Sequence, residues 1–278
     1  MPSEFTSHRV KVNGLELHYL EWGSAASPPL LLLHGSAGHA HVWDLLAARL
    51  CQRYRIIALD QRGHGDSRWA APAAYSARDY VADLKAFTEA LNLDRLILIG
   101  HSMGALHSMI YAGSTPGRVD QLVIIDIEAN PPLWQKEFLN KAGQKPHQPF
   151  ASLEEAAQDE ARRSPNASPE VLLQLAAYST KRLADGKLIY KFDRATLREF
   201  DSYDARPYLS LIACPTLIIR GALSEVMSAE AARLMQQVIP DCRLIEIEDA
   251  GHTVFLDQPV RFEESVTAFL SSGEGSIF

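Results

Sequence analysis

The chain has 278 residues, of which 47% are hydrophobic and 22% are charged, and its formal net charge is −7. A chain of this length can bury the core of one large domain without disulfides or metal ions. The acidic balance and the lack of any basic run of five or more residues argue against a nucleic-acid partner, because neutralising phosphates needs a cationic surface.

The cysteines Cys51, Cys214 and Cys242 are odd in number and show no C-x-x-C spacing. We therefore expect neither a disulfide framework nor a metal site, and no cofactor. Residues 1–9 lack the apolar segment of a signal peptide, and no stretch approaches the about 18 apolar residues of a membrane span. These features predict a cytoplasmic protein without a membrane span, and they leave the oligomeric state open.

The first half of the chain alternates between strand and helix patterns. Asn13-Gly14 predicts a hairpin turn, and the apolar run 30–33 is typical of a strand buried on both faces. Such alternation indicates βαβ units and a parallel sheet. The expected elements in chain order are strands at 9–12, 15–21 and 30–33, a helix at 41–51, a strand at 55–59, a helix at 76–91, a strand at 95–99, a helix at 102–114 and a strand at 119–125.

The pattern changes between residues 127 and 207, which contain Pro131-Pro132 and charged or apolar helical stretches but no continuous Val/Ile/Leu strand. The alternation then resumes with a strand at 216–220, a helix at 229–238, a strand at 243–247 and a helix at 259–270. The simplest interpretation is one α/β core formed by residues 1–126 and 208–278, with residues 127–207 inserted as a mainly helical cap.

Residues 100–104 read Gly-His-Ser-Met-Gly and lie between a predicted strand and a predicted helix. This is the G-x-S-x-G pattern in the context that it requires. A strand-to-helix turn this sharp strains the backbone of the serine, and side chains at Gly100 and Gly104 would collide with it. The serine hydroxyl would also lie near the positive end of the helix dipole. We therefore predict that Ser102 is a nucleophile.

Four motifs together resemble the α/β-hydrolase superfamily, and they occur in the order of that family. They are Leu33-His34-Gly35-Ser36-Ala37-Gly38, Asp60-Gln61-Arg62-Gly63-His64-Gly65-Asp66-Ser67, Gly100-His101-Ser102-Met103-Gly104 and Gly251-His252. The resemblance covers the chain except the cap. It implies an α/β-hydrolase fold, which is a mostly parallel twisted sheet with helices on both faces and an inserted helical cap, and it implies serine-hydrolase chemistry. It does not specify the substrate, because this fold hosts many reactions.

A serine nucleophile needs an imidazole that takes its proton and later gives it to the leaving group. Among the ten histidines, only His252 has a suitable position after a predicted strand and the chain order Ser…acid…His. His8, His18 and His147 lie in surface-like contexts, where we expect them to be solvated. His252 is thus the predicted general base.

Acyl transfer also needs fixed N–H donors that stabilise the alkoxide, together called the oxyanion hole. The residue after the nucleophile, Met103, supplies one backbone N–H at the start of the helix. The resemblance places the second donor at the backbone N–H of Ser36, in the loop after the strand at 30–33.

The acid of the catalytic triad has two candidates. Most relatives carry an aspartate three residues after a glycine that ends the strand at 216–220, but here Ser224 occupies that position and Glu225 follows it. Some branches of the superfamily place the acid after the preceding strand, where Asp126 stands. A carboxylate that ends an apolar strand needs a partner such as an imidazole. We favour Asp126, with Ser224 in the same hydrogen-bond network and Glu225 as the alternative acid.

These residues predict an enzyme that cleaves a carboxylic ester, thioester or lactone of a small molecule through an acyl-Ser102 intermediate. Ser102 excludes epoxide hydrolases and haloalkane dehalogenases, which need a carboxylate there. Two alternatives stay open: a carbon–carbon bond hydrolase with the same triad, and a receptor-like protein that binds its ligand without turnover.

The cap would form the roof of the substrate pocket, since insertions at this end of the sheet overlie the crevice beyond the strands. Several apolar cap side chains are candidates for an acyl site, although packing between cap and core would explain them equally well. They are Trp134, Phe138, Leu172, Leu173 and Tyr178.

Overall fold

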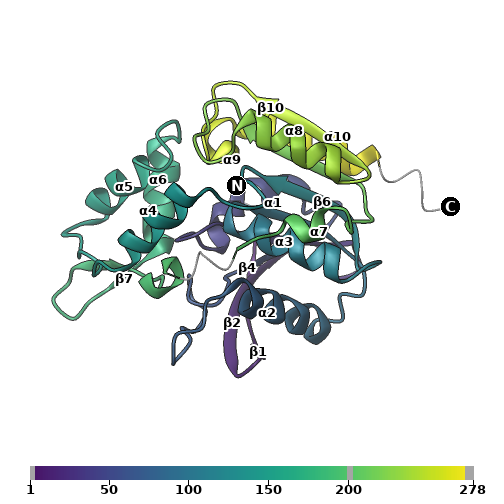
Figure 1. Cartoon of the computed structure of the whole chain (residues 1–278). Coiled ribbons are helices and arrows are strands. Elements are labelled where there is room, and N and C mark those ends of the chain that lie inside the picture. Colours follow the sequence, from purple (N-terminus) through teal and green to yellow (C-terminus); the bar gives the residue numbers. More distant parts are fainter. Residues whose placement is uncertain (1–3, 199–202, 273–278) are drawn as a thin grey trace.

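The computed structural model describes residues 4–198 and 203–272. Its centre is an eight-stranded sheet with the order β1-β2-β4-β3-β5-β6-β9-β10 (Figure 1). Strand β2 pairs antiparallel with β1 and β4, and the pairs from β4 to β10 are parallel. The strands are β1 (Thr6–Val12), β2 (Leu15–Trp22), β3 (Pro29–Leu33), β4 (Arg55–Leu59), β5 (Leu96–His101), β6 (Val119–Ile125), β9 (Thr216–Gly221) and β10 (Cys242–Ile247). The predicted mostly parallel α/β sheet is confirmed.

Helices cover both faces of this sheet. Alternate residues of the central strands point to opposite sides, and the apolar side chains on each side are buried against helices. Leu31 and Leu33 of β3 belong to one buried cluster, whereas Leu30 and Leu32 belong to another. The first cluster includes side chains of α2 (Ala77–Ala90), α3 (Met103–Ser114) and α8 (Ala229–Val238). The second includes side chains of α1 (Asp44–Leu50), α9 (Val254–Asp257) and α10 (Pro259–Ser272), and it also contains the 3₁₀ turn η1 (Ala40–Trp43).

The elements between residues 133 and 197 form a group beside the sheet, at one end of the molecule (Figure 1). These elements are α4 (Leu133–Gly143), α5 (Leu153–Ala161), α6 (Pro169–Ser179), β7 (Thr180–Arg182), β8 (Leu188–Tyr190) and the 3₁₀ turn η2 (Arg194–Leu197), followed by α7 (Arg206–Leu209). A small cluster of buried side chains, among them Phe150, Leu188 and Phe192, packs within this segment. The β7–β8 hairpin was not expected, since three-residue strands leave no readable alternation.

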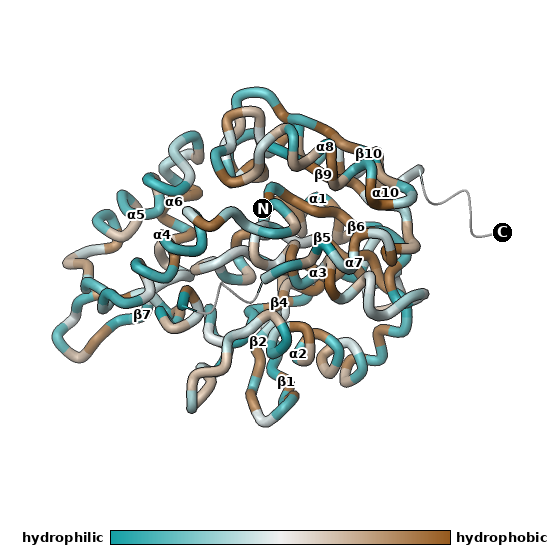
Figure 2. Tube along the Cα trace, in the orientation of Figure 1, coloured by the Kyte–Doolittle hydropathy of each residue, from teal (hydrophilic) through white to brown (hydrophobic). Residues whose placement is uncertain are grey.

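The polarity of the elements follows this layering. In Figure 2 the central strands and α3 are largely hydrophobic, whereas α5 is largely hydrophilic. No helix in the described ranges has both the length and the apolar character needed to cross a bilayer.

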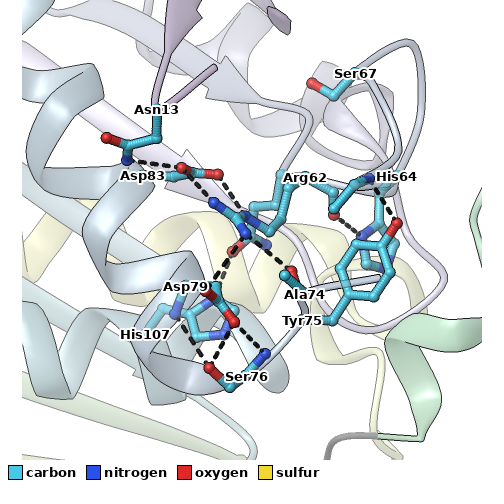
Figure 3. Close-up of polar contacts among 12 residues, drawn as sticks. Asn13, Arg62, His64, Ser67, Ala74, Tyr75, Ser76, Asp79, Asp83 and His107 are labelled. Atoms are coloured by element: carbon cyan, nitrogen blue, oxygen red, sulfur yellow. Dashed lines mark hydrogen bonds and ion pairs between the residues drawn. The ribbon is translucent and has the colours of Figure 1, made fainter. Parts of the chain in front are cut away.

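The loop after β4 is fixed by buried polar contacts on both sides. Arg62 forms a bidentate ion pair with Asp83 of α2, with two N···O distances of 2.6 Å, and also donates to the Ala74 carbonyl (Figure 3). Asp60 accepts from His18 Nδ1 (2.7 Å) and from the backbone N–H of Ala40 (2.6 Å). The expectation that His18 is solvated is wrong, because it is 4% exposed and bound to this carboxylate.

Candidate active site

Four polar residues follow four neighbouring strands at the same edge of the sheet. Ser102 follows β5, Asp126 follows β6, Ser224 lies just beyond β9, and His252 lies beyond β10. The carboxyl ends of parallel strands meet at one edge, so a contiguous polar site can form there from residues far apart in the sequence.

Ser102 occupies a strained backbone conformation with φ 52° and ψ −121°. Its backbone N–H donates to the Ile125 carbonyl (2.9 Å), which ties the turn to the end of β6. A Cβ on Gly104 would lie 2.4 Å from the Leu33 carbonyl oxygen, and one on Gly100 would lie 2.6 Å from the Gly104 carbonyl oxygen. The sharp turn therefore requires both glycines, as the sequence pattern predicts.

The Asp126 carboxylate is fully buried and accepts three hydrogen bonds. His252 Nδ1 donates to Oδ2 at 2.8 Å, and the Ser224 hydroxyl donates to the same oxygen at 2.5 Å. The backbone N–H of Gly221 donates to Oδ1 at 3.0 Å. Glu225 is exposed. The structure thus brings Asp126, Ser224 and His252 together, while Glu225 points elsewhere.

His101 holds the loop that carries His252. Burial lowers the pKa of His101 well below its usual value, so the ring is neutral and has a single N–H. Its Nε2 donates to the His252 carbonyl oxygen at 2.9 Å, and the two ring centroids are 4.6 Å apart. Sequence reasoning gave His101 no role, and its only signal was its position next to Ser102.

The loop after β3 lies directly against the serine turn. A Cβ on Gly35 would be 3.0 Å from Ser102 Cβ. The backbone N–H groups of Ser36 and Met103 have no acceptor in the described part of the chain, so they can receive an oxyanion. The Ser102 hydroxyl also has no hydrogen-bond partner in the described part of the chain, and His252 is not bonded to it. Hydrogen bonds between a catalytic serine and its histidine often form only when substrate binds.

A cavity of about 70 Å³ lies beside the serine turn. Its walls come from the loop after β3 with η1, from His101, from Thr253 with α9, and from the region of α5 and α6, which contributes Glu160, Arg163, Ser164 and Leu175. Ser102 and His252 are not among its lining residues. Arg163 is paired with Glu160 at 2.9 Å. The cavity is small beside the roughly 300–1,000 Å³ of pockets for drug-sized ligands.

None of the five apolar side chains considered for an acyl site lines this cavity. Trp134 and Phe138 of α4 are 52% and 66% exposed, and Leu173 is also exposed. Tyr178 stacks on His41 with ring centroids 3.4 Å apart, and Leu172 packs against buried clusters. Helical spacing did not reveal which face of each helix turns toward the sheet.

One group in the described ranges has three side chains with ligand atoms close enough to hold a metal: His18, Asp60 and Asp66. The His18 and Asp60 atoms are already paired with each other, and Asp66 is paired with Lys191 at 2.9 Å. Hydrogen bonds and ion pairs account for this cluster.

The model of the alpha/beta hydrolase fold matches residues 28–259. The chain belongs to the α/β-hydrolase family. This α/β hydrolase is 30% identical over 275 residues to a 2-(acetamidomethylene)succinate hydrolase of Mesorhizobium japonicum, covering 96% of each chain. It is 26% identical to an N-formylmaleamate deformylase of Pseudomonas putida, covering 88% of this chain and 89% of the relative. The solved structure of an E-2-(acetamidomethylene)succinate hydrolase superposes with a TM-score of 0.89 at 28% identity, covering 96% of this chain and 100% of that one.

Proposed function

We propose that this α/β hydrolase cleaves a small carboxylic ester, thioester or lactone through an acyl-Ser102 intermediate. The observation that supports this most directly is the 2.8 Å hydrogen bond between Asp126 and His252, at the sheet edge that also carries the strained Ser102. A carboxylate on Nδ1 leaves Nε2 free to act as general base, and it stabilises the imidazolium that forms.

In the proposed reaction, Ser102 Oγ attacks the carbonyl carbon while His252 Nε2 takes the serine proton. The carbonyl oxygen becomes an alkoxide that accepts from the backbone N–H groups of Ser36 and Met103. When the alkoxide collapses, the bond to the leaving group breaks, and His252 gives its proton to that group. A water molecule activated by His252 then releases the acid and regenerates Ser102.

The cavity beside the serine turn is lined by Ser36 and His101 but not by Ser102, and its small volume supports short acyl groups over long chains. The exposed apolar residues of α4 lie outside its lining and do not enlarge it. We therefore expect an acetyl or similar group to be accepted better than an octanoyl group.

A second candidate reaction is hydrolysis of a small N-acyl compound. It is favoured by the relatives at 30% and 26% identity, whose names contain an acetamido and an N-formyl group. The same triad serves this reaction, because only the leaving group differs.

A substrate panel tests both reactions. It comprises p-nitrophenyl acetate and octanoate, an acetyl thioester, a lactone, 2-(acetamidomethylene)succinate and N-formylmaleamate, each assayed for kcat/KM. We expect multiple turnover on the short-acyl members and the lowest kcat/KM on the octanoate. Covalent labelling by a fluorophosphonate without turnover on any member would instead favour a ligand-binding protein.

A further inference from the structure

Gln61 follows Asp60 and precedes Arg62, and both neighbours are fixed by buried polar contacts. Figure 3 shows those of Arg62. Its own backbone N–H donates to His34 Nε2 at 3.1 Å, and its side-chain Nε2 donates to the His34 carbonyl at 2.7 Å. Gln61 is therefore a rigidly held group with two bonds to the loop after β3.

These bonds set the direction of the Ser36 N–H. Burial lowers the pKa of His34, so its ring is neutral and has one N–H. Because His34 Nε2 accepts from Gln61, the proton lies on Nδ1, which donates to the Gly35 carbonyl at 2.8 Å. In the trans Gly35–Ser36 peptide the carbonyl and the N–H point in opposite directions. Fixing the Gly35 oxygen thus fixes the Ser36 N–H.

The orientation of the Gln61 amide is set in turn by His107 of α3. Burial lowers the pKa of His107 well below its usual value, so this ring is also neutral. Its Nδ1 lies 2.6 Å from Gln61 Oε1, which can only accept, so Nδ1 carries the proton. His107 Nε2 must then accept, and the Tyr203 hydroxyl donates to it at 3.1 Å.

We propose that Tyr203, His107 and Gln61 form a hydrogen-bond relay that positions the Ser36 N–H of the oxyanion hole. Each member donates to the next in one direction, and the relay ends at the His34 carbonyl, while the backbone N–H of Gln61 binds the His34 ring. Tyr203 is buried and lies in the sequence between η2 and α7. The relay therefore makes the geometry of the oxyanion hole depend on the position of Tyr203 relative to α3. The inference rests on the proposed function.

Tyr203→Phe removes the first donor. His107 Nε2 then loses the hydroxyl that faces it, and among the described residues the ring keeps only its Nδ1–H hydrogen bond to Gln61 Oε1. With one hydrogen bond fewer on the ring that orients it, the Gln61 amide is held less firmly against the His34 carbonyl. Losing an oxyanion donor outright costs roughly 10²–10³ in kcat, so we expect about a 10-fold loss for a misaligned one. KM for p-nitrophenyl acetate should change little, because the donor acts in the transition state.

The decisive readout is the ratio of kcat for p-nitrophenyl acetate to kcat for its thionoester, in which sulfur replaces the carbonyl oxygen. Sulfur accepts hydrogen bonds weakly, so the thionoester makes little use of the hole. Tyr203→Phe and Gln61→Met should lower the ester rate more than the thionoester rate, which shrinks the ratio. Gln61→Met keeps the side-chain length and tests the relay if Tyr203→Phe does not fold.

Tyr75→Phe is the matched control. Tyr75 donates to Asp193 at 2.7 Å and thus also links the core to the inserted segment through a buried hydroxyl, but it lies outside the relay. It should lower the melting temperature without changing the ratio. If the relay variants lower kcat for the ester and for the thionoester by the same factor, or lower neither, the relay is overturned while the proposed function stands. Ester hydrolysis that survives in Ser102→Ala would overturn both.

Discussion

At the scale of single residues, the site depends on how a buried carboxylate is satisfied. Asp126 is fully buried and receives donors from His252, Ser224 and the Gly221 backbone, so its charge is balanced by three hydrogen bonds. The sequence alone identified Asp126, Ser224 and His252, and it favoured Asp126 as the acid with Glu225 as the alternative. A one-residue difference in a tight loop turns a side chain toward solvent, and no pattern in the sequence encodes that direction.

Asp126→Asn should lower kcat far more than Glu225→Gln. An amide next to His252 Nδ1 can favour the wrong imidazole tautomer, and the same change in a serine protease costs about 10⁴-fold. The measurement is kcat for both variants and for the double variant, with circular dichroism as the control for folding. Glu225→Gln as the crippling change would show that the acid follows β9 instead of β6.

Ser224→Ala removes one of the three donors to Asp126 and leaves the bond to His252 in place. We expect a loss of about 1–3 kcal/mol in the free energy of unfolding, as for a buried acceptor that loses a partner. The fall in kcat should be smaller than for Asp126→Asn. Chemical denaturation and kcat measured together check this, and an unchanged stability would mean that water replaces the hydroxyl.

At the scale of elements, the continuous apolar strands were predicted most accurately. The predicted strands at 55–59 and 119–125 have the observed bounds of β4 and β6, because strands buried on both faces leave unbroken apolar runs. The β7–β8 hairpin and the relay residues Gln61, His107 and Tyr203 were missed. The hairpin was missed because its three-residue strands leave no readable alternation. The relay depends on contacts between residues up to 96 positions apart, which local patterns do not carry.

The contact between α3 and the loop after β3 can be tested at Gly104. Alanine is favoured over glycine inside a helix by about 1 kcal/mol. A Cβ there, however, would lie 2.4 Å and 2.6 Å from the carbonyl oxygens of Leu33 and His34, which are backbone atoms. We expect Gly104→Ala to lower the free energy of unfolding by about 1–3 kcal/mol, as overpacking does, and to lower kcat by displacing the loop after β3, which carries the proposed oxyanion donor Ser36.

Gly14→Ala is the control for that variant. Gly14 has φ +80° and nothing within 4 Å of an added Cβ, so it suffers backbone strain alone. It should lose stability and keep kcat. A Gly104→Ala enzyme with the kcat of the unmodified protein would contradict the tight packing of these two elements.

At the scale of the whole molecule, buried neutral histidines make stability depend on pH. Burial lowers the pKa of His39 and of His64 to about 3 from the usual 6.5. The unfolded chain therefore binds more protons than the folded chain between these values, and stability falls as the pH drops. Burial acts in the same direction on the pKa of His34, His101 and His107.

Each such histidine costs about 1.4 kcal/mol per pH unit below its unfolded pKa. His39 and His64 alone predict a loss of about 4 kcal/mol in the free energy of unfolding between about pH 7 and pH 5. Urea denaturation at several pH values in this range measures the slope. A flat profile would mean that these rings take up protons in the folded state.

The acyl-Ser102 intermediate is the central claim, and trapping it is the most direct test. The protein is quenched with acid during turnover of p-nitrophenyl acetate, and peptide mass spectrometry then locates the acetyl group. We predict an acetyl adduct on the peptide that contains Ser102, no adduct in Ser102→Ala, and loss of turnover in that variant with its fold intact. An adduct at another residue, or Ser102→Ala turning over the ester at the rate of the unmodified protein, would contradict the mechanism.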